Sequence, residues 1–352
     1  MTHIPDKNPL GLNGFAFAEF TSPDPAGMAA QFEQFGFVAA ARLPARQLTL
    51  YRQGRINIIL NAGTTGQGAD FAALHGPSAN GMAFRVADAG AAYAYALSQG
   101  AVPADAASGA LGADAHVIQG IGGSLLYLVD NDSFASWEEV PGWQAESDIQ
   151  NVGLDLLDHL THNVRRGEMR TWSNFYGNIF GFEEQKYFDI KGQATGLFSQ
   201  AMIAPDRAIR IPLNESQDDK SQIEEFLREY KGEGIQHLAL STPDIFTTVE
   251  KLRARGVALQ DTIETYYELV DKRVPGHGED LARLKANRIL IDGDVENEGI
   301  LLQIFTENLF GPIFFEIIQR KGNEGFGNGN FQALFESIEL DQIRRGVISV
   351  AS

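Results

Sequence analysis

The sequence predicts an α+β fold made of four βαβββ modules, each a strand, a helix and three further strands. Two observations lead to this prediction. Segments of the first half recur in the second half in the same order, and short β-like runs follow each predicted helix. One such module cannot close a curved sheet by itself. We therefore expect the modules to pair into two open β-barrel domains, each around a cavity.

The first pair of matching segments begins the two halves. Residues 14–20 (GFAFAEF) are typical of a strand, and residues 24–35 of an amphipathic helix that a glycine ends. Residues 158–164 (DHLTHNV) and 168–180 repeat that order. Both halves then continue with the same two residues, Gly-Phe. The match indicates an internal duplication.

A second pair of matching segments completes the repeat. Residues 81–86 and 88–99 predict a strand and a helix, as do residues 237–242 and 244–255. The β-like runs that fill the modules are residues 48–51, 56–61, 124–129, 208–212, 289–292 and 301–306.

The domain boundary is expected near residue 150, since residues 131–151 form an acidic stretch that contains a proline. Residues 1–150 would then form an N-terminal barrel domain and residues 151–352 a C-terminal one. Residues 331–347 place the apolar positions 331, 334, 335 and 338 on one helical face, so a final helix should pack over the second barrel.

Composition limits the kind of partner. The 352 residues are 44% hydrophobic and 21% charged, as expected of a globular protein large enough for two cores. The net charge of −18 argues against binding nucleic acid or an anionic membrane, because a polyanion would be repelled. An anionic ligand would need local neutralisation, which a bound divalent metal supplies.

The chain has no cysteine, which excludes disulfides, thiolate metal sites and cysteine nucleophiles. A metal site must therefore use His, Asp or Glu. Residues 1–10 are polar, and no apolar run approaches the length of about 20 residues that spans a membrane. We expect a cytoplasmic protein.

Two histidines and a glutamate, His159, His237 and Glu316, follow one another at nearly equal intervals in the second half. Two imidazoles and one carboxylate leave about three octahedral positions open, which suits non-haem Fe(II) binding an oxo-acid and dioxygen together. The regular spacing indicates a metal site that arose with the duplication.

Each of these residues also has an ordinary structural explanation. A histidine in a strand is often a hydrogen-bonded core residue, and Glu316 could lie on the solvent face of its strand. However, Phe314 and Ile318 share the face of Glu316 and should be buried, and a buried carboxylate needs a partner or a metal. In the first half, Phe15 and Gly81 occupy the positions of His159 and His237, so we expect the N-terminal domain to be structural.

The other histidines are expected outside the site. His162 should face the opposite side of its strand from His159. The remaining ones lie in predicted turns or polar loops, where solvent exposure is expected: His3, His75, His116 and His277.

Uncharged polar residues near the predicted strands are candidates for orienting a small ligand: Ser199, Asn214, Gln222, Gln236, Gln303 and Asn330. Residues 325–331 (GFGNGNF) lack the Lys-Ser/Thr of a phosphate loop and instead indicate a flexible hinge that carries Phe326 and Phe331 toward a cavity mouth. No G-x-S-x-G nucleophile elbow occurs.

Several motifs of the second half resemble the 4-hydroxyphenylpyruvate dioxygenase family, which has the vicinal-oxygen-chelate, or glyoxalase-like, fold. They are LLDHLTHNV, RIPLNE, SQIEEF, GIQHLAL, ILLQIF, FFEIIQRKG and GFGNGNFQALFESIE. The resemblance is dense from about residue 150 onward and looser before it.

The resemblance implies that His159, His237 and Glu316 bind one Fe(II) per chain. It implies an enzyme of tyrosine and phenylalanine catabolism that converts 4-hydroxyphenylpyruvate and O2 to homogentisate and CO2 by oxidative decarboxylation, ring hydroxylation and a 1,2-shift of the side chain. Ser199, Asn214, Gln222 and Gln236 would line the polar pocket, with Gln303 near the iron. The matching aromatic walls are Phe305, Phe314, Phe326 and Phe331, the last helix acts as a gate, and homodimers or tetramers are common in the family.

Two other functions stay open at this point. Hydroxymandelate synthase uses the same substrate and iron, but it departs from the PLN pattern around Asn214 and has smaller residues in its aromatic wall, whereas this chain has Phe305. A glyoxalase-type isomerase on the same fold normally needs four protein ligands. A binding protein without metal is disfavoured by the intact ligand set.

Overall fold

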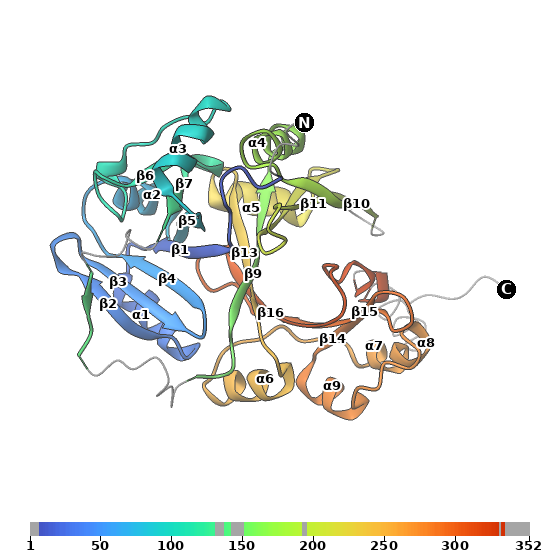
Figure 1. The fold of residues 1–352 in the computed structure, drawn as a ribbon. Helices are drawn as coiled ribbons and strands as arrows, with labels where there is room; N and C mark the ends of the chain where they lie inside the picture. Colours follow the sequence, from blue (N-terminus) through green and yellow to red (C-terminus); the bar gives the residue numbers. More distant parts are fainter. Residues whose placement is uncertain (1–6, 131–136, 142–150, 192–195, 331, 335–352) are drawn as a thin grey trace. The chain divides into compact units, whose positions relative to one another are not determined.

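The computed structural model describes residues 7–130, 137–141, 151–191, 196–330 and 332–334. These residues form two mixed eight-stranded sheets with helices beside them (Figure 1). The predicted α+β class and the duplication are confirmed, because strands β1–β8 make one sheet and strands β9–β16 the other.

The N-terminal sheet has the strand order β6-β7-β5-β1-β4-β3-β2-β8. Its strands are β1 (Phe15–Thr21), β2 (Val38–Leu43), β3 (Leu48–Gln53), β4 (Ile56–Asn61), β5 (Ser78–Arg85), β6 (His116–Gln119), β7 (Leu125–Val129) and β8 (Glu138–Glu139). β1 pairs in parallel with β4 and antiparallel with β5. The two end strands do not pair with each other, so the sheet is open.

The C-terminal sheet has the equivalent order, β10-β11-β12-β9-β13-β16-β15-β14. Its strands are β9 (Leu156–Val164), β10 (Glu183–Lys191), β11 (Gly196–Ile203), β12 (Arg210–Ser216), β13 (Gly234–Ser241), β14 (Leu290–Asp294), β15 (Gly299–Phe305) and β16 (Phe314–Lys321). β9 pairs in parallel with β12, as β1 does with β4.

The four predicted helices are present as α1 (Pro25–Gln34), α3 (Ala89–Ser98), α4 (Met169–Phe180) and α6 (Ile245–Ala254). Asp24, Asp88 and Asp244 cap α1, α3 and α6 through their carboxylates, which accept a backbone N–H of the first turn. Helices without a sequence prediction are α2 (Gln67–His75), α5 (Gln222–Tyr230), α7 (Glu264–Glu268), α8 (Val270–Arg273) and α9 (Leu281–Asn287).

One module differs in detail from the βαβββ plan. After α3 this module has two strands, β6 and β7, and an isolated bridge between Pro103 and Ile118, while the short β8 that follows pairs with β2 of the first module. Pro103 has no backbone N–H to donate, so it cannot extend this bridge into a full ladder. The predicted helix at residues 331–347 lies mostly outside the described residues, of which 328–330 and 332–334 are helical.

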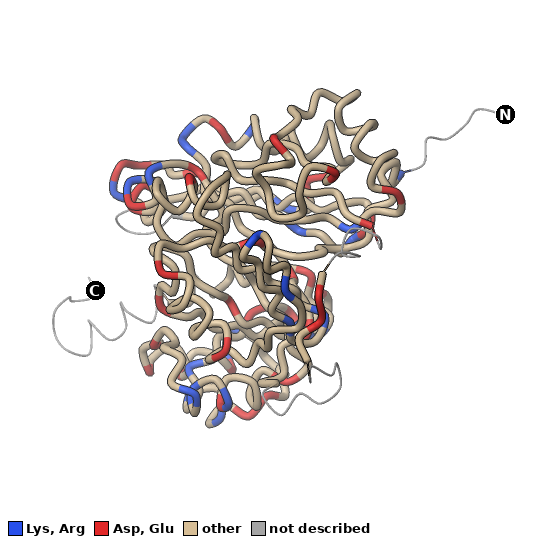
Figure 2. Tube along the Cα trace, turned by 90° about the vertical axis from the view of Figure 1, so that its left-hand side faces the viewer, with Lys and Arg blue, Asp and Glu red and all other residues tan. Residues whose placement is uncertain are grey.

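The chain divides into two compact units. One comprises Met1–Asn151, Leu157–Leu238 and Asn308–Phe314, and the other Val152–Leu156, Ala239–Glu307 and Phe315–Ser352. The domain boundary near residue 150 stays a prediction. In the described residues, no helix is both long and apolar enough to cross a membrane. Acidic residues occur along the whole trace rather than in one segment (Figure 2).

Candidate metal centre

The three predicted metal ligands come from strands that are consecutive in the C-terminal sheet, β9, β13 and β16. His159, His237 and Glu316 each offer one ligand atom, and these atoms lie within 4.8 Å of one another. His159 and Glu316 are each only 2% exposed, and His237 is half-buried. The burial of Glu316 excludes the solvent-exposed position that its strand could also have given it.

The Nδ1 atoms of His159 and His237 each lie next to an oxygen that can accept a hydrogen bond, which leaves Nε2 of each ring for a metal. His159 Nδ1 lies 2.8 Å from the buried Asp158 carboxylate, and His237 Nδ1 lies 2.8 Å from Gln236 Oε1. Because an ionised carboxylate only accepts, His159 must donate from Nδ1, which leaves the lone pair on Nε2. This arrangement orients both rings as metal ligands and makes them more basic.

The His237 ring is held from two further directions. Thr161 Oγ1 lies 3.0 Å from His237 Nε2, and the Phe314 ring stacks on the imidazole with centroids 4.8 Å apart. With Nδ1–H donating to Gln236, the Thr161 hydroxyl is the donor to Nε2. The lone pair that a metal needs is therefore present in the neutral ring.

A chain of hydrogen bonds fixes the carboxylate ligand. Gln303 Nε2 donates to Glu316 Oε1 at 3.1 Å, Asn330 Nδ2 donates to Gln303 Oε1 at 2.9 Å, and the Tyr266 hydroxyl donates to Asn330 Oδ1 at 2.6 Å. Arg273 in turn donates to the Tyr266 oxygen at 2.7 Å. Every donor in the chain points toward Glu316, so the dipoles reinforce one another and stabilise the ionised carboxylate.

The backbone conformation at Gly327 and the space around it explain why one position of segment 325–331 is a glycine. Its φ is +72°, and a Cβ atom there would overlap the Gln303 amide. Asn330 N donates to Gly327 O at 3.0 Å, and Gly329 N donates to Asp292 Oδ2 at 2.8 Å. Residues 327–330 are thus hydrogen-bonded beside Gln303, and the flexible hinge stays a prediction.

A polar row crosses three strands of the same sheet. Ser199 on β11 pairs in register with Asn214 on β12, which pairs with Asn163 on β9. Register partners share a face, and on β9 the residues 159, 161 and 163 alternate onto one face. The row thus lies on the face that carries His159. Both polar atoms of the buried Asn163 amide lack a hydrogen-bond partner within the described residues.

Comparison with known proteins decides the family. Residues 6–139 match the family described as hydroxyphenylpyruvate dioxygenase, N-terminal, and residues 156–269 match the glyoxalase, bleomycin resistance protein and dioxygenase superfamily. A 4-hydroxyphenylpyruvate dioxygenase of Pseudomonas aeruginosa is 56% identical, with 98% of both chains covered. The chain belongs to the 4-hydroxyphenylpyruvate dioxygenase family. It is a non-haem iron dioxygenase, and its two-histidine, one-carboxylate donor set fits that metal.

Other similar proteins agree with this family. Hemolysin VllY of Vibrio vulnificus is 54% identical, with 98% of this chain and 99% of that protein covered. Among solved structures, a triple mutant of 4-hydroxymandelate synthase from Streptomyces coelicolor has a TM-score of 0.78 at 26% identity, with 94% of this chain and 99% of that chain covered. The vicinal-oxygen-chelate fold is confirmed.

The structure places the other predicted site residues as follows. Ser199, Gln303 and Asn330 are buried, and Asn214, Gln236, Phe305, Phe314 and Phe326 are half-buried. Gln222 is exposed, as the first residue of α5. Phe331 lies outside the described residues. The pocket roles of these residues stay predictions.

Sequence reasoning missed several residues that the structure places around the metal centre. Asp158 and Asn163 flank His159 within β9, and their positions beside a predicted ligand were the available signal. Tyr266 comes from α7, which had no prediction. Two exposure predictions are also wrong: His75 is buried and stacks on Tyr230, and the His277 side chain is 6% exposed beside Asp271.

A buried carboxylate of the N-terminal sheet, Glu19, has a structural role. It accepts hydrogen bonds from Asn61, Asn80 and Tyr127 at 2.8, 2.8 and 2.6 Å. Three donors satisfy most of its acceptor capacity, and burial raises the pKa of Glu19. No second His/Asp/Glu cluster suited to a metal occurs in the described part of the chain.

Proposed function

We propose that this protein converts 4-hydroxyphenylpyruvate and O2 to homogentisate and CO2 with one Fe(II) per chain. The observation that carries the proposal is the buried cluster of His159, His237 and Glu316, whose ligand atoms converge within 4.8 Å. Family membership supplies the expected substrate. A member with these ligands should share the chemistry of its relatives.

The donor set fits the expected metal. His159, His237 and Glu316 would hold Fe(II), with Asp158, Gln236 and Gln303 fixing their orientation. Fe(II), when bound, supplies binding of the 2-oxo acid and activation of dioxygen. The substrate carboxylate needs no arginine or lysine, because the metal neutralises it.

The polar row is suited to the far end of the substrate. Asn163 is four residues from His159 along β9, which corresponds to about 13 Å of strand. That spacing suits an elongated ligand with its oxo acid at the histidines and its phenol at the row. We propose that Ser199, Asn214 and Asn163 bind the phenolic oxygen, and the unpaired amide of Asn163 supports this.

The half-buried Phe314 gives the substrate an aromatic wall beside His237. We propose that Phe305, Phe326 and Phe331 extend this wall and that the last helix gates the site. An apolar wall excludes water and holds the ring in place for reaction. Gln222, as the first residue of α5, would reach the polar pocket from the start of that helix.

The deciding experiment is an anaerobic titration of the iron-loaded protein with 4-hydroxyphenylpyruvate, followed by exposure to oxygen and mass analysis of the products. Homogentisate and CO2 are expected. Hydroxymandelate would instead assign the synthase reaction, and no iron-dependent product would overturn both.

The Glu316→Gln variant tests whether Glu316 is the third metal ligand. It keeps the size of the side chain and removes its charge, so iron binding and turnover should fall severely while the fold stays intact. Unchanged turnover would show that Glu316 is not the third ligand.

Three further predictions belong to the same proposal. We propose that residues 1–150 form a structural domain and residues 151–352 the catalytic one, that the protein acts in the cytoplasm, and that it forms a homo-oligomer. Light scattering during size-exclusion chromatography measures the oligomeric state directly.

A further inference from the structure

Thr161 lies on β9 between the metal ligand His159 and Asn163 of the polar row. Residues 159, 161 and 163 alternate onto one face of the strand, so Thr161 is about 7 Å along β9 from each of the other two. The Thr161 side chain is buried. Its position places a hydroxyl group beside the middle of any ligand that reaches from the metal centre to the polar row.

One hydrogen bond joins Thr161 to the metal centre. The Thr161 hydroxyl donates to His237 Nε2 at 3.0 Å, because Nδ1–H of that ring donates to Gln236 Oε1. This is the only hydrogen bond that the Thr161 side chain makes within the described residues. Nε2 is also the His237 atom that would bind iron. The Thr161 oxygen therefore lies next to the coordination positions of the metal.

The Thr161 hydroxyl needs a different acceptor once His237 binds iron. The lone pair of Nε2 is then shared with the metal and no longer accepts from Thr161. Buried hydroxyl groups in proteins are almost always hydrogen-bonded, so the O–H group should turn to another oxygen. An oxygen atom of a small ligand on the same metal is the acceptor that this position favours.

The order of groups along the expected substrate points to its ketone. In 4-hydroxyphenylpyruvate the keto group lies between the carboxylate and the ring. With the carboxylate at the histidines and the phenol at the polar row, the keto group is displaced from the carboxylate toward Asn163. Thr161 is displaced from His159 in the same direction along β9. The keto oxygen is therefore the substrate atom that best matches the Thr161 hydroxyl.

The N-terminal sheet has an aromatic residue at the equivalent position. Strand β1 corresponds to β9, since each pairs in parallel with the last strand of its module, and Phe17 occupies the place of Thr161. Phe17 is buried and packs on Tyr127, with ring centroids 5.3 Å apart. The sheet without metal ligands thus fills this position with an apolar ring, whereas the metal-binding sheet has a hydroxyl there.

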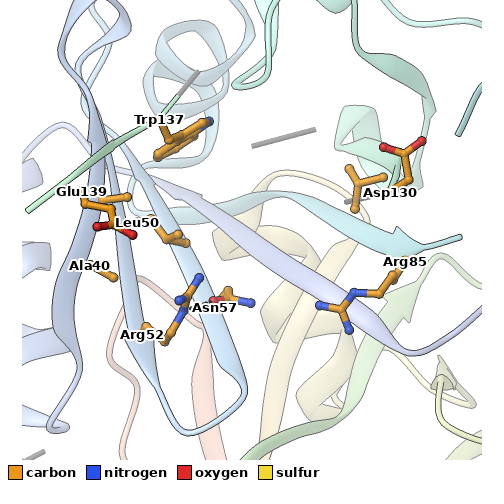
Figure 3. Close-up of a pocket in the computed structure, with 10 residues that line it drawn as sticks. Ala40, Leu50, Arg52, Asn57, Arg85, Asp130, Trp137 and Glu139 are labelled. Atoms are coloured by element: carbon orange, nitrogen blue, oxygen red, sulfur yellow. Dashed lines mark hydrogen bonds between the residues drawn. The ribbon is translucent and has the colours of Figure 1, made fainter. Parts of the chain in front are cut away.

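The N-terminal sheet has a hollow of about 290 Å³, but neither Phe17 nor Tyr127 lines it (Figure 3). The charged residues of its lining are two guanidinium groups and two carboxylates: Arg52, Arg85, Asp130 and Glu139. Opposite charges in equal number favour neither an anion nor a cation. The buried hydroxyl beside a ligand position is therefore a feature of the C-terminal sheet alone among these equivalent strands.

We propose that Thr161 binds the substrate directly, by donating a hydrogen bond from its hydroxyl to the keto oxygen of the 2-oxo acid. This proposal rests on the proposed function, because it takes 4-hydroxyphenylpyruvate as the ligand of the metal centre. It adds a polar contact in the middle of the substrate to those expected at its two ends.

Calorimetric titration of the anaerobic, iron-loaded protein with 4-hydroxyphenylpyruvate tests this contact. Thr161→Val keeps the size of the side chain and loses the hydroxyl, so Kd should rise about threefold to tenfold. Thr161→Ser keeps the hydroxyl and should bind nearly as the wild type does. Competition against a chelator measures the Fe(II) affinity of each variant, so that all are compared at equal iron saturation.

The analogue 3-(4-hydroxyphenyl)propionate isolates the keto group, because it keeps the carboxylate and the phenol but has CH2 in place of the ketone. Thr161→Val should bind this analogue as the wild type does. Thr21→Val is the matched control variant. Thr21 is a buried threonine of the N-terminal sheet, and its hydroxyl donates to Gly68 O at 2.9 Å. It should leave both dissociation constants unchanged.

Three results would overturn the proposal: an unchanged Kd for 4-hydroxyphenylpyruvate in Thr161→Val, equal weakening of the substrate and the analogue, or Thr161→Ser binding as weakly as Thr161→Val. Turnover separates this proposal from the proposed function. If the wild type binds and converts 4-hydroxyphenylpyruvate and Thr161→Val binds it equally well, only the role of Thr161 is wrong. A wild type that neither binds nor converts it overturns the proposed function, and this proposal with it.

Discussion

At the scale of single residues, the two histidine ligands are oriented by side chains of different charge. His159 is oriented by a carboxylate, Asp158, whereas His237 is oriented by the neutral amide of Gln236. A carboxylate makes its histidine more basic and contributes negative charge near the metal. Asp158 should therefore matter more for metal affinity than Gln236.

We expect Asp158→Asn to weaken Fe(II) binding by about 10- to 100-fold, because the variant keeps the shape of the side chain but loses its charge. Competition titration against a chelator measures this affinity. Asp88→Asn is the control, since asparagine also caps helices and α3 should keep its cap. Equal affinity of the Asp158 variant and the wild type would contradict the role assigned to Asp158.

His162 gives a prediction about pH. Its Nε2 lies 2.7 Å from the Tyr176 hydroxyl, and burial lowers the pKa of His162 to about 3. In the unfolded chain a histidine titrates near pH 6.5, so between these values the unfolded state binds more protons. The free energy of unfolding should therefore fall as the pH drops below 6.5, with His162 contributing about 1.5 kcal/mol of the loss by pH 5.

Denaturant unfolding at pH 6.5 and pH 5 checks this contribution. A His162→Gln variant should be less stable than the wild type at pH 6.5 and should lose less stability on acidification. Parallel losses in the two proteins would mean that His162 is not the titrating group.

At the scale of elements, helix α7 and the segment after β16 together orient the Glu316 carboxylate through hydrogen bonds. The donors run from Arg273 through Tyr266, Asn330 and Gln303 to Glu316. Burial raises the pKa of Tyr266 to about 12, so its hydroxyl stays protonated and donates at neutral pH. Two elements that are distant in sequence thus hold one ligand.

We expect Tyr266→Phe to lower turnover by about threefold to tenfold, because it leaves Asn330 Oδ1 unpaired and removes the oxygen that accepts from Arg273 and from Ile291 N. Tyr267→Phe is the matched control. Tyr267 is buried next to it, with ring centroids 5.0 Å apart, and its hydroxyl takes no part in the chain of hydrogen bonds to Glu316. Steady-state assays with saturating iron measure both variants, and equal losses would contradict the chain of hydrogen bonds.

The elements also show what the sequence could predict. Strands and helices with a clear apolar period, such as β9 and α4, were found within a few residues. Helix α5 was missed although Ser221 and Glu224 form the capping-box pattern S-x-x-E, and Ser221 does accept from Glu224 N.

Interactions between distant segments account for the other errors. His75 is the last residue of α2, next to the turn residues Gly76 and Pro77, and only tertiary packing brings Tyr230 over its ring. The ligands His159 and Glu316 could be predicted because a charged or ionisable group in an apolar strand is itself a signal. The Tyr266–Asn330 contact has no such signal, since neither residue is unusual in its local sequence.

At the scale of the whole molecule, charge should affect how an anionic substrate arrives. The chain carries 46 acidic and 28 basic residues, which gives its net charge of −18, and the acidic residues are spread along the trace (Figure 2). An approaching 2-oxo acid anion is therefore repelled at long range, and attraction begins only near the metal. The Debye length is about 30 Å at 10 mM ionic strength and about 8 Å at 150 mM, so salt should screen the repulsion.

We expect kcat/KM for 4-hydroxyphenylpyruvate to rise a few-fold as ionic strength increases from about 10 to about 150 mM, while kcat stays nearly constant. The repulsion slows encounter, which enters kcat/KM, but it does not act once the substrate is bound. Iron saturation is kept equal at each salt concentration, and sucrose at matched osmolality serves as the uncharged control. A fall in kcat/KM with salt would mean that a local positive field at the metal centre, rather than the net charge, governs the approach of the substrate.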